Sequence, residues 1–360
     1  MSPHQVRRPT LDTIARHVGV SRATVSNAYN RPDQLSAELR ERIIATAKKL
    51  GYAGPDPVAR SLATQRTGSV AFMLCDGLSS AFSDPALSIM LDAFTSTVDS
   101  GDHALLLLPG IDNAGPRAQS VMSAQTDVVV AYALPDDAPA LRAVRARTLP
   151  LLVVDQPALP NTARVQVDDA GGAELAARHV AELGHRDVGI VSLELNPDGA
   201  HGPVPDERIV TARHRVTVDR IAGYRTGLAG HGILAGEVSI WEARGSAREL
   251  GREGARWILG RPRRPTALLC MSDELALGAI RAAEELGVRV PEEVSIVGFD
   301  DTPAARWSDP PLTTVRQDLV EKGRRAGELA LRLLAGARPG RPITIGVELV
   351  TRASTGPAPT

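Results

Sequence analysis

The 360-residue sequence has few cysteines and lacks long apolar runs. Its two cysteines, Cys75 and Cys270, lie far apart within apolar segments, so they form neither a disulfide framework nor a metal-binding spacing. No stretch approaches about eighteen consecutive apolar residues, which argues against a membrane span. The N-terminal MSPHQVRRPTLD carries two arginines without an apolar run behind them, unlike a secretory signal. We therefore expect a cytoplasmic protein without membrane association.

The motifs of common catalytic and nucleotide-binding sites are also missing. There is no GxGxxG after the first strand of the body, and no GxxxxGK[ST], HExxH or GxSxG anywhere. The eight histidines are scattered, and His185 in LGHRD lies at a predicted helix-to-strand turn, where a structural hydrogen bond is the expected role. The sequence thus predicts no metal, no cofactor and no enzymatic activity.

Charge is distributed unevenly along the chain. Residues 1–66 contain 11 basic and 5 acidic residues, a formal charge of +6, whereas the remainder contains 30 basic and 37 acidic residues, a charge of -7. A basic head on an acidic body suits contact with a polyanion such as DNA, although a basic surface can equally be only solvated.

The basic head is predicted to contain three short helices. In the first, the apolar residues Leu11, Ile14, Ala15 and Val18 share one face, Thr10 caps the start and Gly19 ends it. Ser21 and Ser36 are placed to cap the second and third helices. A helix, a glycine turn and a second short helix form a helix-turn-helix, whose second helix is offered to the major groove.

From about Gly68 the pattern changes to short apolar runs that alternate with helical stretches. The runs SVAFMLC, HALLLLP, DVVVAYAL, LPLLVVD, DVGIVSL, TALLCMSD and EVSIVGFDD suit strands that are buried on both faces of a parallel sheet. This alternation over nearly 300 residues predicts a doubly wound α/β body in two lobes. One segment, residues 194–218, is long for a strand–helix connection and is predicted to be either functional or disordered.

Several motifs together resemble the LacI/GalR family of transcription regulators. The head carries TLDTIARHVGVSRATVSNAYN, SAELRERIIATAKKLGY and PDPVARSLATQRTG. The body carries VDDAGGAELAARHVAELGHRDVGIV, DRIAGYRTGL, SDELALGAIRAAEELGVRVPEEVSIVGFDD and PPLTTVRQD. The resemblance implies a helix-turn-helix domain over residues 1–53, a hinge helix or linker over 54–67, and a two-lobed effector-binding and dimerisation domain over 68–360. The body would be similar to periplasmic sugar-binding proteins.

The resemblance also implies which residues contact double-stranded DNA. Arg22 and Ala23, in the first turn of the second helix, would face base edges, with Asn27 about one turn further along. Arginine matches guanine, asparagine matches adenine, and alanine can contact a thymine methyl. Asn27 departs from the family, which usually has arginine there. The other candidates in the head are the cap and phosphate contacts Ser21 and Thr24, the capping Thr10, and Tyr29 and Asn30, for which packing and DNA contact remain open.

A second mode of DNA contact is implied for the hinge. Two copies of PVARSLAT would become helical when paired in the minor groove, with Leu62 wedged between central base steps and Ala59 allowing close helix pairing. The chain ends at TRASTGPAPT without a heptad-bearing tail, so we expect a homodimer on a pseudopalindromic operator.

For the body, the resemblance implies an effector pocket between the lobes. Its candidate residues are Phe82, Asp155, Arg220, Ser272, Asp273, Asp300 and Gln317. An arginine and carboxylates around a small cavity suit a hydroxyl-rich ligand, so a sugar or glycoside is favoured, with a nucleoside or other metabolite acting as corepressor as the alternative. A plain solute-binding protein and a cytoplasmic α/β enzyme are the competing classes, and the intact head and the missing catalytic motifs argue against them.

Overall fold

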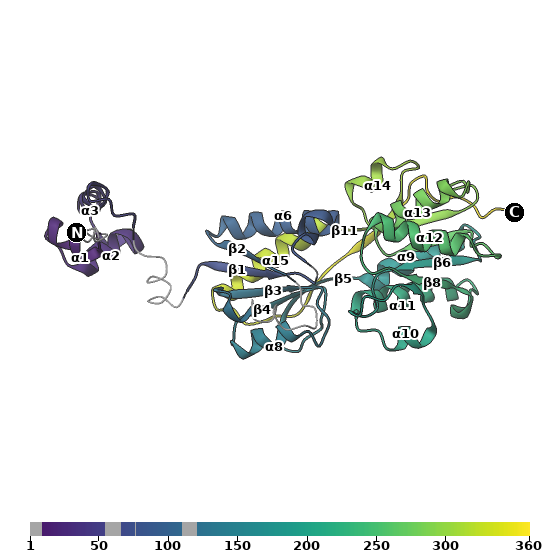
Figure 1. Cartoon of the computed structure of the whole chain (residues 1–360), viewed down its shortest axis with the longest axis horizontal. Coiled ribbons are helices and arrows are strands. Elements are labelled where there is room, and N and C mark those ends of the chain that lie inside the picture. The colour runs from purple at the N-terminus through teal and green to yellow at the C-terminus, as the bar shows by residue number, and fades with distance from the viewer. Residues whose placement is uncertain (1–8, 55–65, 76, 110–120) are drawn as a thin grey trace, which may run out of the picture. The chain divides into compact units, whose positions relative to one another are not determined.

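The computed structural model describes residues 9–54, 66–75, 77–109 and 121–360. The chain divides into two compact units, residues 1–67 and 68–360. Each unit is described separately below (Figure 1). The hinge residues Ala59 and Leu62, and most of the predicted hinge helix, lie outside the described residues.

The first unit is helical and is organised by its caps. It contains helices α1 (Leu11–Val18), α2 (Arg22–Asn30) and α3 (Ala37–Lys49), with a 3₁₀ turn at Pro32–Gln34. Thr10 caps α1, Ser21 caps α2 and Ser36 caps α3, each accepting a hydrogen bond from a backbone N–H in the first turn. Gly19 ends α1 with a φ of 77°, a conformation that costs glycine little.

A small apolar core joins these three helices. Ile14 on α1, Val25 and Ala28 on α2, and Ile43 and Ala47 on α3 are almost fully buried. The sharp turn at Gly19 brings α1 and α2 together, and α3 packs against both. The predicted helix-turn-helix is therefore confirmed in its helices, its caps and its buried face.

The second unit consists of two α/β lobes, each built around one sheet (Figure 1). Lobe 1 comprises β1 (Ser69–Met73), α5 (Ser80–Ser83), α6 (Pro85–Ser100), β2 (Ala104–Leu108), β3 (Val128–Tyr132), α8 (Pro139–Ala146), β4 (Leu151–Val154), β5 (Ala163–Val167), α15 (Leu319–Leu334) and β12 (Ile343–Ile345). Lobe 2 comprises α9 (Asp169–Glu182), β6 (Val188–Ser192), β7 (Gly202–Pro203), α10 (Asp206–Val210), α11 (Arg215–Ala229), a 3₁₀ turn at Ala235–Glu237, β8 (Ser239–Glu242), α12 (Arg248–Leu259), β9 (Ala267–Cys270), α13 (Asp273–Glu285), β10 (Ser295–Asp300), α14 (Pro303–Trp307), β11 (Thr313–Gln317) and β13 (Val347–Val350).

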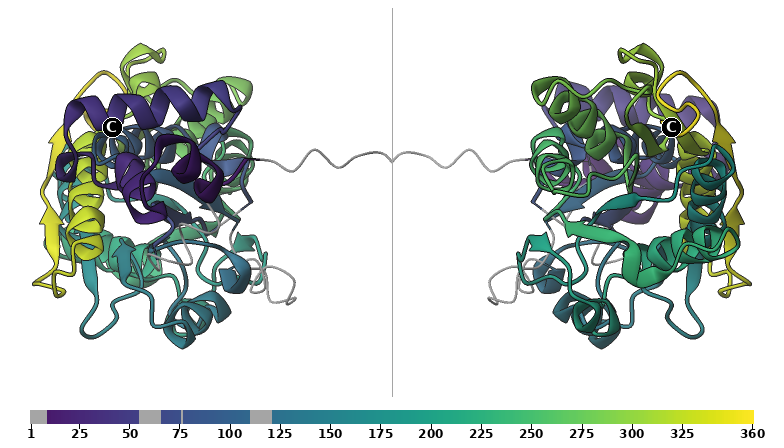
Figure 2. Two further views of the ribbon diagram at one scale, coloured as in Figure 1. Left: turned by 90° about the vertical axis from the view of Figure 1, so that its left-hand side faces the viewer. Right: turned by 90° about the vertical axis from the view of Figure 1, so that its right-hand side faces the viewer.

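Both sheets are mainly parallel. The sheet of lobe 1 has the order β12-β5-β4-β3-β1-β2, and every described pairing in it is parallel. The sheet of lobe 2 has the order β13-β11-β10-β9-β6-β8-β7, in which only the described edge pairings, β11 with β13 and β7 with β8, are antiparallel. Helices cover both faces of each sheet, and the C-terminal strands β12 and β13 lie at sheet edges (Figure 2). The predicted two-lobed α/β body is confirmed.

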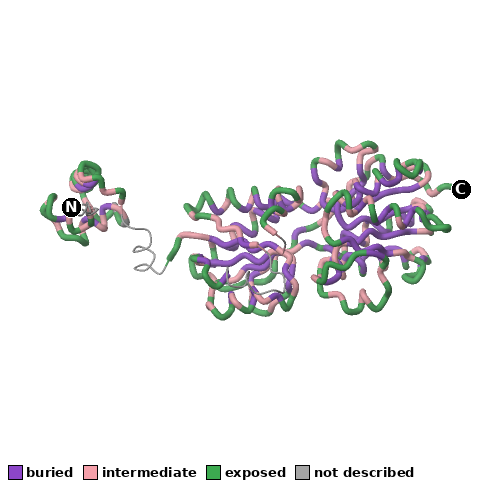
Figure 3. The backbone as a smooth tube through the Cα atoms, viewed as in Figure 1, coloured by how far each residue is buried: buried purple, intermediate pink, exposed green. Residues whose placement is uncertain are grey.

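Burial follows from this layered arrangement. The central strands of both lobes are buried along nearly their whole length, while helix faces that point away from the sheets are exposed (Figure 3). Within the described part of the chain, no helix is long and apolar enough to cross a membrane.

The chain passes from one lobe to the other where strands end. Strand β5 of lobe 1 leads into α9 of lobe 2, and β11 of lobe 2 leads into α15 of lobe 1. A further passage joins β12 to β13 near the C-terminus. Because parallel strands present their carboxyl ends at one edge of a sheet, these passages bring the carboxyl-terminal edges of both sheets close together.

Candidate functional site

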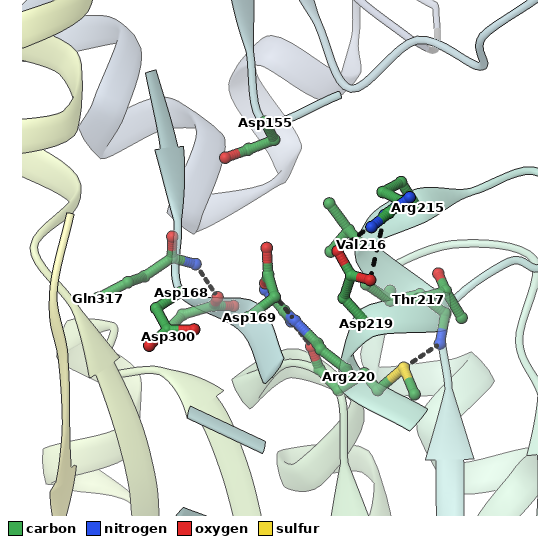
Figure 4. Close-up of polar contacts among 12 residues, drawn as sticks. Asp155, Asp168, Asp169, Arg215, Val216, Thr217, Asp219, Arg220, Asp300 and Gln317 are labelled. Carbon is green, nitrogen blue, oxygen red and sulfur yellow. Dashed lines mark hydrogen bonds and ion pairs between the residues drawn. The ribbon is translucent and has the colours of Figure 1, made fainter. Parts of the chain in front are cut away.

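A cavity of about 150 Å³ lies between the two lobes. It is lined from lobe 1 by residues that follow β3 and β4, and from lobe 2 by residues at the ends of β9, β10 and β11. Five of the seven candidate effector residues line it: Asp155, Arg220, Ser272, Asp300 and Gln317. Figure 4 shows four of these side chains directed toward the same space from both lobes.

Backbone strain marks the ends of the strands that reach this cavity. Asp155, immediately after β4, has a φ of 65°, and Asp300, at the end of β10, has a φ of 125°. Such conformations cost about 1–3 kcal/mol each in residues other than glycine, and they gather where side chains must be aimed. Both aspartates lie next to the cavity, so the strain is located where a binding role is expected.

Arg220, on α11, is held rigidly at the cavity wall. Its Nε donates to Asp169 Oδ1 at 2.8 Å, its Nη1 donates to the carbonyl oxygen of Met271, and its guanidinium carbon lies 3.6 Å from the ring centroid of Phe299. Burial opposes the charge, but Asp169 and Asp300 outweigh it and raise the pKa of Arg220. The arginine therefore stays charged and needs no ligand to fix its position.

A chain of polar contacts links the two lobes across the cavity. Asp155 Oδ2 of lobe 1 accepts from Lys322 Nζ at 2.6 Å, and Lys322 Nζ also donates to Gln317 Oε1 at 3.2 Å. Gln317 Nε2 in turn donates to Asp300 Oδ1 at 2.6 Å in lobe 2. Burial raises the pKa of Asp300 well above its usual value. These side chains give the cavity alternating donors and acceptors.

Asp273 and Phe82 are placed differently from the other candidates. Asp273 is fully buried outside the cavity lining, where its carboxylate accepts from the N–H and hydroxyl of Thr302 and from the hydroxyl of Thr314. It therefore fastens α13 to the strands beside it, while the preceding Ser272 caps α13 and lines the cavity. Phe82 on α5 is 79% exposed and is not among the lining residues; Ser80 and Asp84 line the cavity from that segment.

The segment 194–218 is ordered and closes one side of the cavity. Arg208 on α10 donates to both oxygens of the buried Glu242, which also accepts from the backbone N–H of Leu195. Arg208 further makes a two-pronged contact with Asp198, at 3.0 and 2.9 Å. The C-terminal end of the segment, including His214, Val216 and Thr217, lines the cavity. Of the two predicted alternatives, a disordered loop is therefore wrong.

Sequence reasoning missed several lining residues, of which Lys322 is the most informative. It lies in the first turn of α15, in a helical pattern that gave no reason to assign it to a pocket. A compositional signal was nevertheless present, since Lys322 is the single lysine in residues 68–360. Gln156 and His214, which also line the cavity and contact each other at 3.1 Å, carried no comparable signal.

In the helical unit, the start of α2 presents the residues expected to read DNA. The side chain of Arg22 is 69% exposed and Ala23 is also exposed. Ser21 Oγ and Thr24 Oγ1 lie 2.8 Å apart at the cap. Asn27 is half-buried and donates to Gln34 Oε1 at 3.3 Å.

The end of α2 contributes to packing. The ring of Tyr29 packs edge-to-face against Tyr52, with 6.0 Å between centroids. The side chain of Asn30 lies outside what the structure describes.

At the start of α1, Thr10 accepts a hydrogen bond from Thr13 N as part of a capping box.

Among the described residues, no cluster of three or more histidine, cysteine or acidic side chains is arranged to hold a metal ion. One chain thus combines a capped helix-turn-helix unit with a two-lobed α/β body that has a cavity between its lobes, and this combination defines a class of protein, a ligand-binding DNA-binding regulator.

Comparison with known proteins identifies the family. Residues 10–54 match the model for "Bacterial regulatory proteins, lacI family", and residues 177–355 match a "Periplasmic binding protein-like domain". An "HTH-type transcriptional regulator" of Mycolicibacterium smegmatis is 41% identical, with 91% of each chain covered. The chain belongs to the LacI family of transcriptional regulators, and its relatives are regulators and not enzymes.

Two solved structures show the same architecture. A lac repressor dimer bound to operator and to the anti-inducer ONPF superposes with a TM-score of 0.76 and 25% identity, covering 97% of this chain and 100% of the repressor chain. A CelR–cellobiose complex superposes with a TM-score of 0.68 and 25% identity, covering 96% of this chain and 100% of the CelR chain.

Proposed function

We propose that this LacI-family regulator is a repressor whose affinity for operator DNA is set by a sugar or glycoside bound between the lobes. The observation that carries this proposal is the cavity itself, where Arg220 and Asp300 of lobe 2 face Asp155 of lobe 1. A ligand that contacts both lobes favours one relative arrangement of them, and it shifts the population toward the state that makes those contacts.

The chemistry of the cavity favours a hydroxyl-rich ligand over a nucleobase. Hydroxyls both donate and accept, so they match a lining in which carboxylates, amides, a guanidinium and an ammonium alternate. A nucleobase would need a flat apolar face, and among the described lining residues only Tyr132 offers one, since the imidazole ring of His214 is polar. The CelR structure contains cellobiose, and that neighbour gives the sugar class further support.

We assign operator reading to the start of α2, which would enter the major groove. There Arg22 would contact guanine, Asn27 adenine, and Ala23 a thymine methyl, each bidentate contact discriminating by about 1–3 kcal/mol. The remaining candidates, Thr10, Ser21 and Thr24, would bond phosphates or the backbone and fix the position of the helix. In the absence of DNA, Asn27 is bonded to Gln34, so this contact must be exchanged for the base.

We further propose that the regulator binds as a homodimer, in the cytoplasm and at the nucleoid. The division into a head over 1–53, a hinge over 54–67 and a body over 68–360 assigns dimerisation to the body and minor-groove contact by Ala59 and Leu62 to the hinge. The lac repressor neighbour is a dimer bound to its operator, which supports this arrangement. Two-fold symmetry then demands a pseudopalindromic operator.

The test is selection of binding sites from a random duplex pool by the purified full-length protein without added ligand. A recovered palindrome with a fixed central step would support the dimer, the hinge and a repressor that an inducer releases. No enrichment at modest salt would contradict binding without ligand, and selection repeated with sugars and nucleosides would then test a corepressor. In a recovered site, Asn27→Ala should relax selectivity at one base pair of each half-site, whereas loss of a phosphate contact weakens all sequences alike.

A further inference from the structure

Lysine is scarce in this protein, and its use in the body is confined to one position. The chain contains three lysines among 41 basic residues: Lys48 and Lys49 in the head, and Lys322. Every other basic position in residues 68–360 is arginine, and nearly all of the described arginines there are at least partly exposed. Lys322, in contrast, has a side chain that is 4% exposed and that lines the cavity between the lobes.

We propose that Lys322 and Asp155 form a paired donor and acceptor that recognises two adjacent hydroxyls of a neutral, polyhydroxylated effector. This proposal rests on the proposed function, because it concerns the same cavity. It adds Lys322 as a residue that determines specificity, and it names the chemical feature of the ligand that is read from lobe 1.

The contacts of the two side chains leave one donor and one acceptor for a ligand. An ammonium has three N–H groups. In Lys322, two of them donate to Asp155 Oδ2 and Gln317 Oε1, which leaves the third for a ligand. Asp155 is itself more than nine-tenths buried, and its Oδ1 has no hydrogen-bond partner in the described part of the chain. A buried acceptor without a partner is costly, so this oxygen points to a group that is supplied from outside.

The two groups are also spaced to serve neighbouring hydroxyls. Lys322 Nζ and Asp155 Oδ2 are 2.6 Å apart, and both residues line the cavity. One hydroxyl can accept from the ammonium while the next donates to Oδ1. A single hydroxyl can serve both groups only where it lies within reach of both, whereas two adjacent hydroxyls can serve each group separately.

The choice of lysine over arginine follows from shape. An ammonium is a compact charge with three rotatable donors, whereas a guanidinium is planar and presents a fixed fork. Lys322 Nζ must reach a carboxylate, an amide and a ligand from one point beside the ring of Tyr132, whose centroid is 5.9 Å away. A planar fork in the same space would meet these partners in a different, fixed geometry.

The charges around the cavity exclude an anionic ligand. Lys322 is neutralised by Asp155, and Arg220 is neutralised by Asp169. The lining also includes the acidic residues Asp84 and Glu194. A phosphate or carboxylate would find both buried cations already neutralised and would lie beside further acidic groups, so repulsion would oppose the one hydrogen bond that Lys322 can still donate.

The experiment measures ligand affinity by calorimetry on the full-length protein and on three variants. The probes are glucose, galactose, ribose, sorbitol and cellobiose as neutral compounds. The phosphate monoesters of glucose and ribose, with glucuronate, serve as anions, and adenosine and guanosine serve as nucleosides. Lys322→Arg keeps the charge but changes the geometry. Asp155→Asn combined with Lys322→Met removes both charges together, so that neither is left buried alone. Arg289→Met, which removes an exposed cation paired with Glu293, is the matched control.

We expect a neutral compound to bind the wild type and Arg289→Met alike and to lose roughly tenfold or more in affinity in both pocket variants. Deoxy analogues of that compound, each lacking one hydroxyl, should include at least one that loses about tenfold on the wild type but no more than about twofold on the double variant. Thermal melting without ligand separates a folding defect from a binding defect.

Several results would overturn the proposal. These are unchanged affinity in Lys322→Arg, or tighter binding of an anion than of its neutral counterpart. Binding of no probe at all would also overturn the diol assignment. Operator selection and its response to ligand test the proposed function. They do not depend on which hydroxyls Lys322 contacts, so the two proposals can fail independently.

Discussion

The guanidinium of Arg220 is held from three sides by groups that are distant in the sequence. Asp169 comes from the start of α9, the carbonyl of Met271 follows β9, and the ring of Phe299 belongs to β10. A buried ion pair of this kind contributes little net stability compared with apolar residues of equal size, but breaking one partner leaves a charge without compensation. Its value lies in fixing the geometry of the cavity wall.

We predict that Arg220→Met lowers the free energy of unfolding of the body by about 3–5 kcal/mol at neutral pH, because Asp169 remains buried alone. Asp169→Asn combined with Arg220→Met should recover much of this loss while still impairing ligand binding. Urea unfolding followed by tryptophan fluorescence measures the effect, since Trp241, Trp257 and Trp307 all lie in residues 68–360. Equal losses in the single and double variants would contradict the ion-pair argument.

The residue scale also shows which parts of the site were predictable. Asp155, Asp300 and Gln317 follow or end apolar strands, and the resemblance placed them in a pocket, where the structure brings them together. Asp273 follows the same kind of strand but begins a helix, and its carboxylate turns inward to Thr302 and Thr314. A sequence pattern locates a strand end, yet it does not fix the direction of a side chain one residue further.

At the scale of elements, the segment 194–218 depends on one arginine. Arg208 joins α10 to the buried Glu242 at the end of β8 and to Asp198 earlier in the segment. Hydrogen bonding to Arg208 lowers the pKa of Asp198 to about 2. The segment then delivers His214 and Thr217 to the cavity, so its order and the shape of the site are connected.

We predict that Arg208→Met leaves Glu242 buried with fewer partners and costs about 1–3 kcal/mol of local stability. Limited trypsin digestion should then cut faster at Arg213 and Arg215, and ligand affinity should fall without any change in operator selection. Arg289→Met is again the control. Unaltered digestion within the segment would show that other contacts hold it.

Helix packing in lobe 2 relies on close approach at glycine. Gly278 on α13 faces α12, and a Cβ added there would overlap the carbonyl oxygen of Arg248. Gly236, in the 3₁₀ turn, has open space around the same position. Alanine substitutions at these two positions therefore distinguish the cost of steric overlap from the effect of replacing a glycine as such.

Gly278→Ala should destabilise the body by about 1–3 kcal/mol through overpacking, although alanine is the better helix former. Gly236→Ala should change stability by less than about 0.5 kcal/mol. Thermal melting of both variants beside the wild type provides the measurement. A neutral Gly278→Ala would mean that α12 and α13 can move apart without loss.

At the scale of the whole molecule, the C-terminal segment is fastened to lobe 2 by histidines. His185 is fully buried and contacts Thr266 Oγ1, Ser295 Oγ and the carbonyl oxygen of Gly356. His179 Nε2 lies 3.0 Å from Thr355 Oγ1. The expected structural role of His185 is confirmed by these contacts.

Burial lowers the pKa of both His179 and His185, so the folded state resists their protonation. The unfolded chain binds these protons below about pH 6.5, and stability should therefore be complete above that pH and decline as the pH falls below it. Burial also raises the pKa of Asp273 to about 7, which produces an opposite slope. The difference between wild type and His179→Gln in urea unfolding at several pH values isolates the histidine. A constant difference from pH 7.5 to 5.5 would contradict this assignment.

The apolar runs of the body located most strands of both sheets, because continuous burial on two faces leaves a continuous apolar sequence. The edge strands β7, β12 and β13 were not foreseen, since they are short and partly exposed. The inner strands β5 (ARVQV) and β11 (TTVRQ) were also missed, because polar residues interrupt their apolar pattern. Lys322 escaped notice for another reason, because helical periodicity says which face is buried but not that the face borders a cavity.

The passages of the chain between the lobes determine how such a protein can move. Gln317 ends β11 immediately before the chain enters α15 of lobe 1, so it lies beside a passage and also lines the cavity. If the lobes rotate about these passages, Gln317 lies close to the axis and is displaced little, whereas Ser80 and Ser246, which line the cavity from different lobes, undergo larger relative displacement. Hydrogen bonds from a ligand to Gln317 would then stabilise every arrangement of the lobes equally. Only contacts of the ligand with residues far from the axis would favour one arrangement over another.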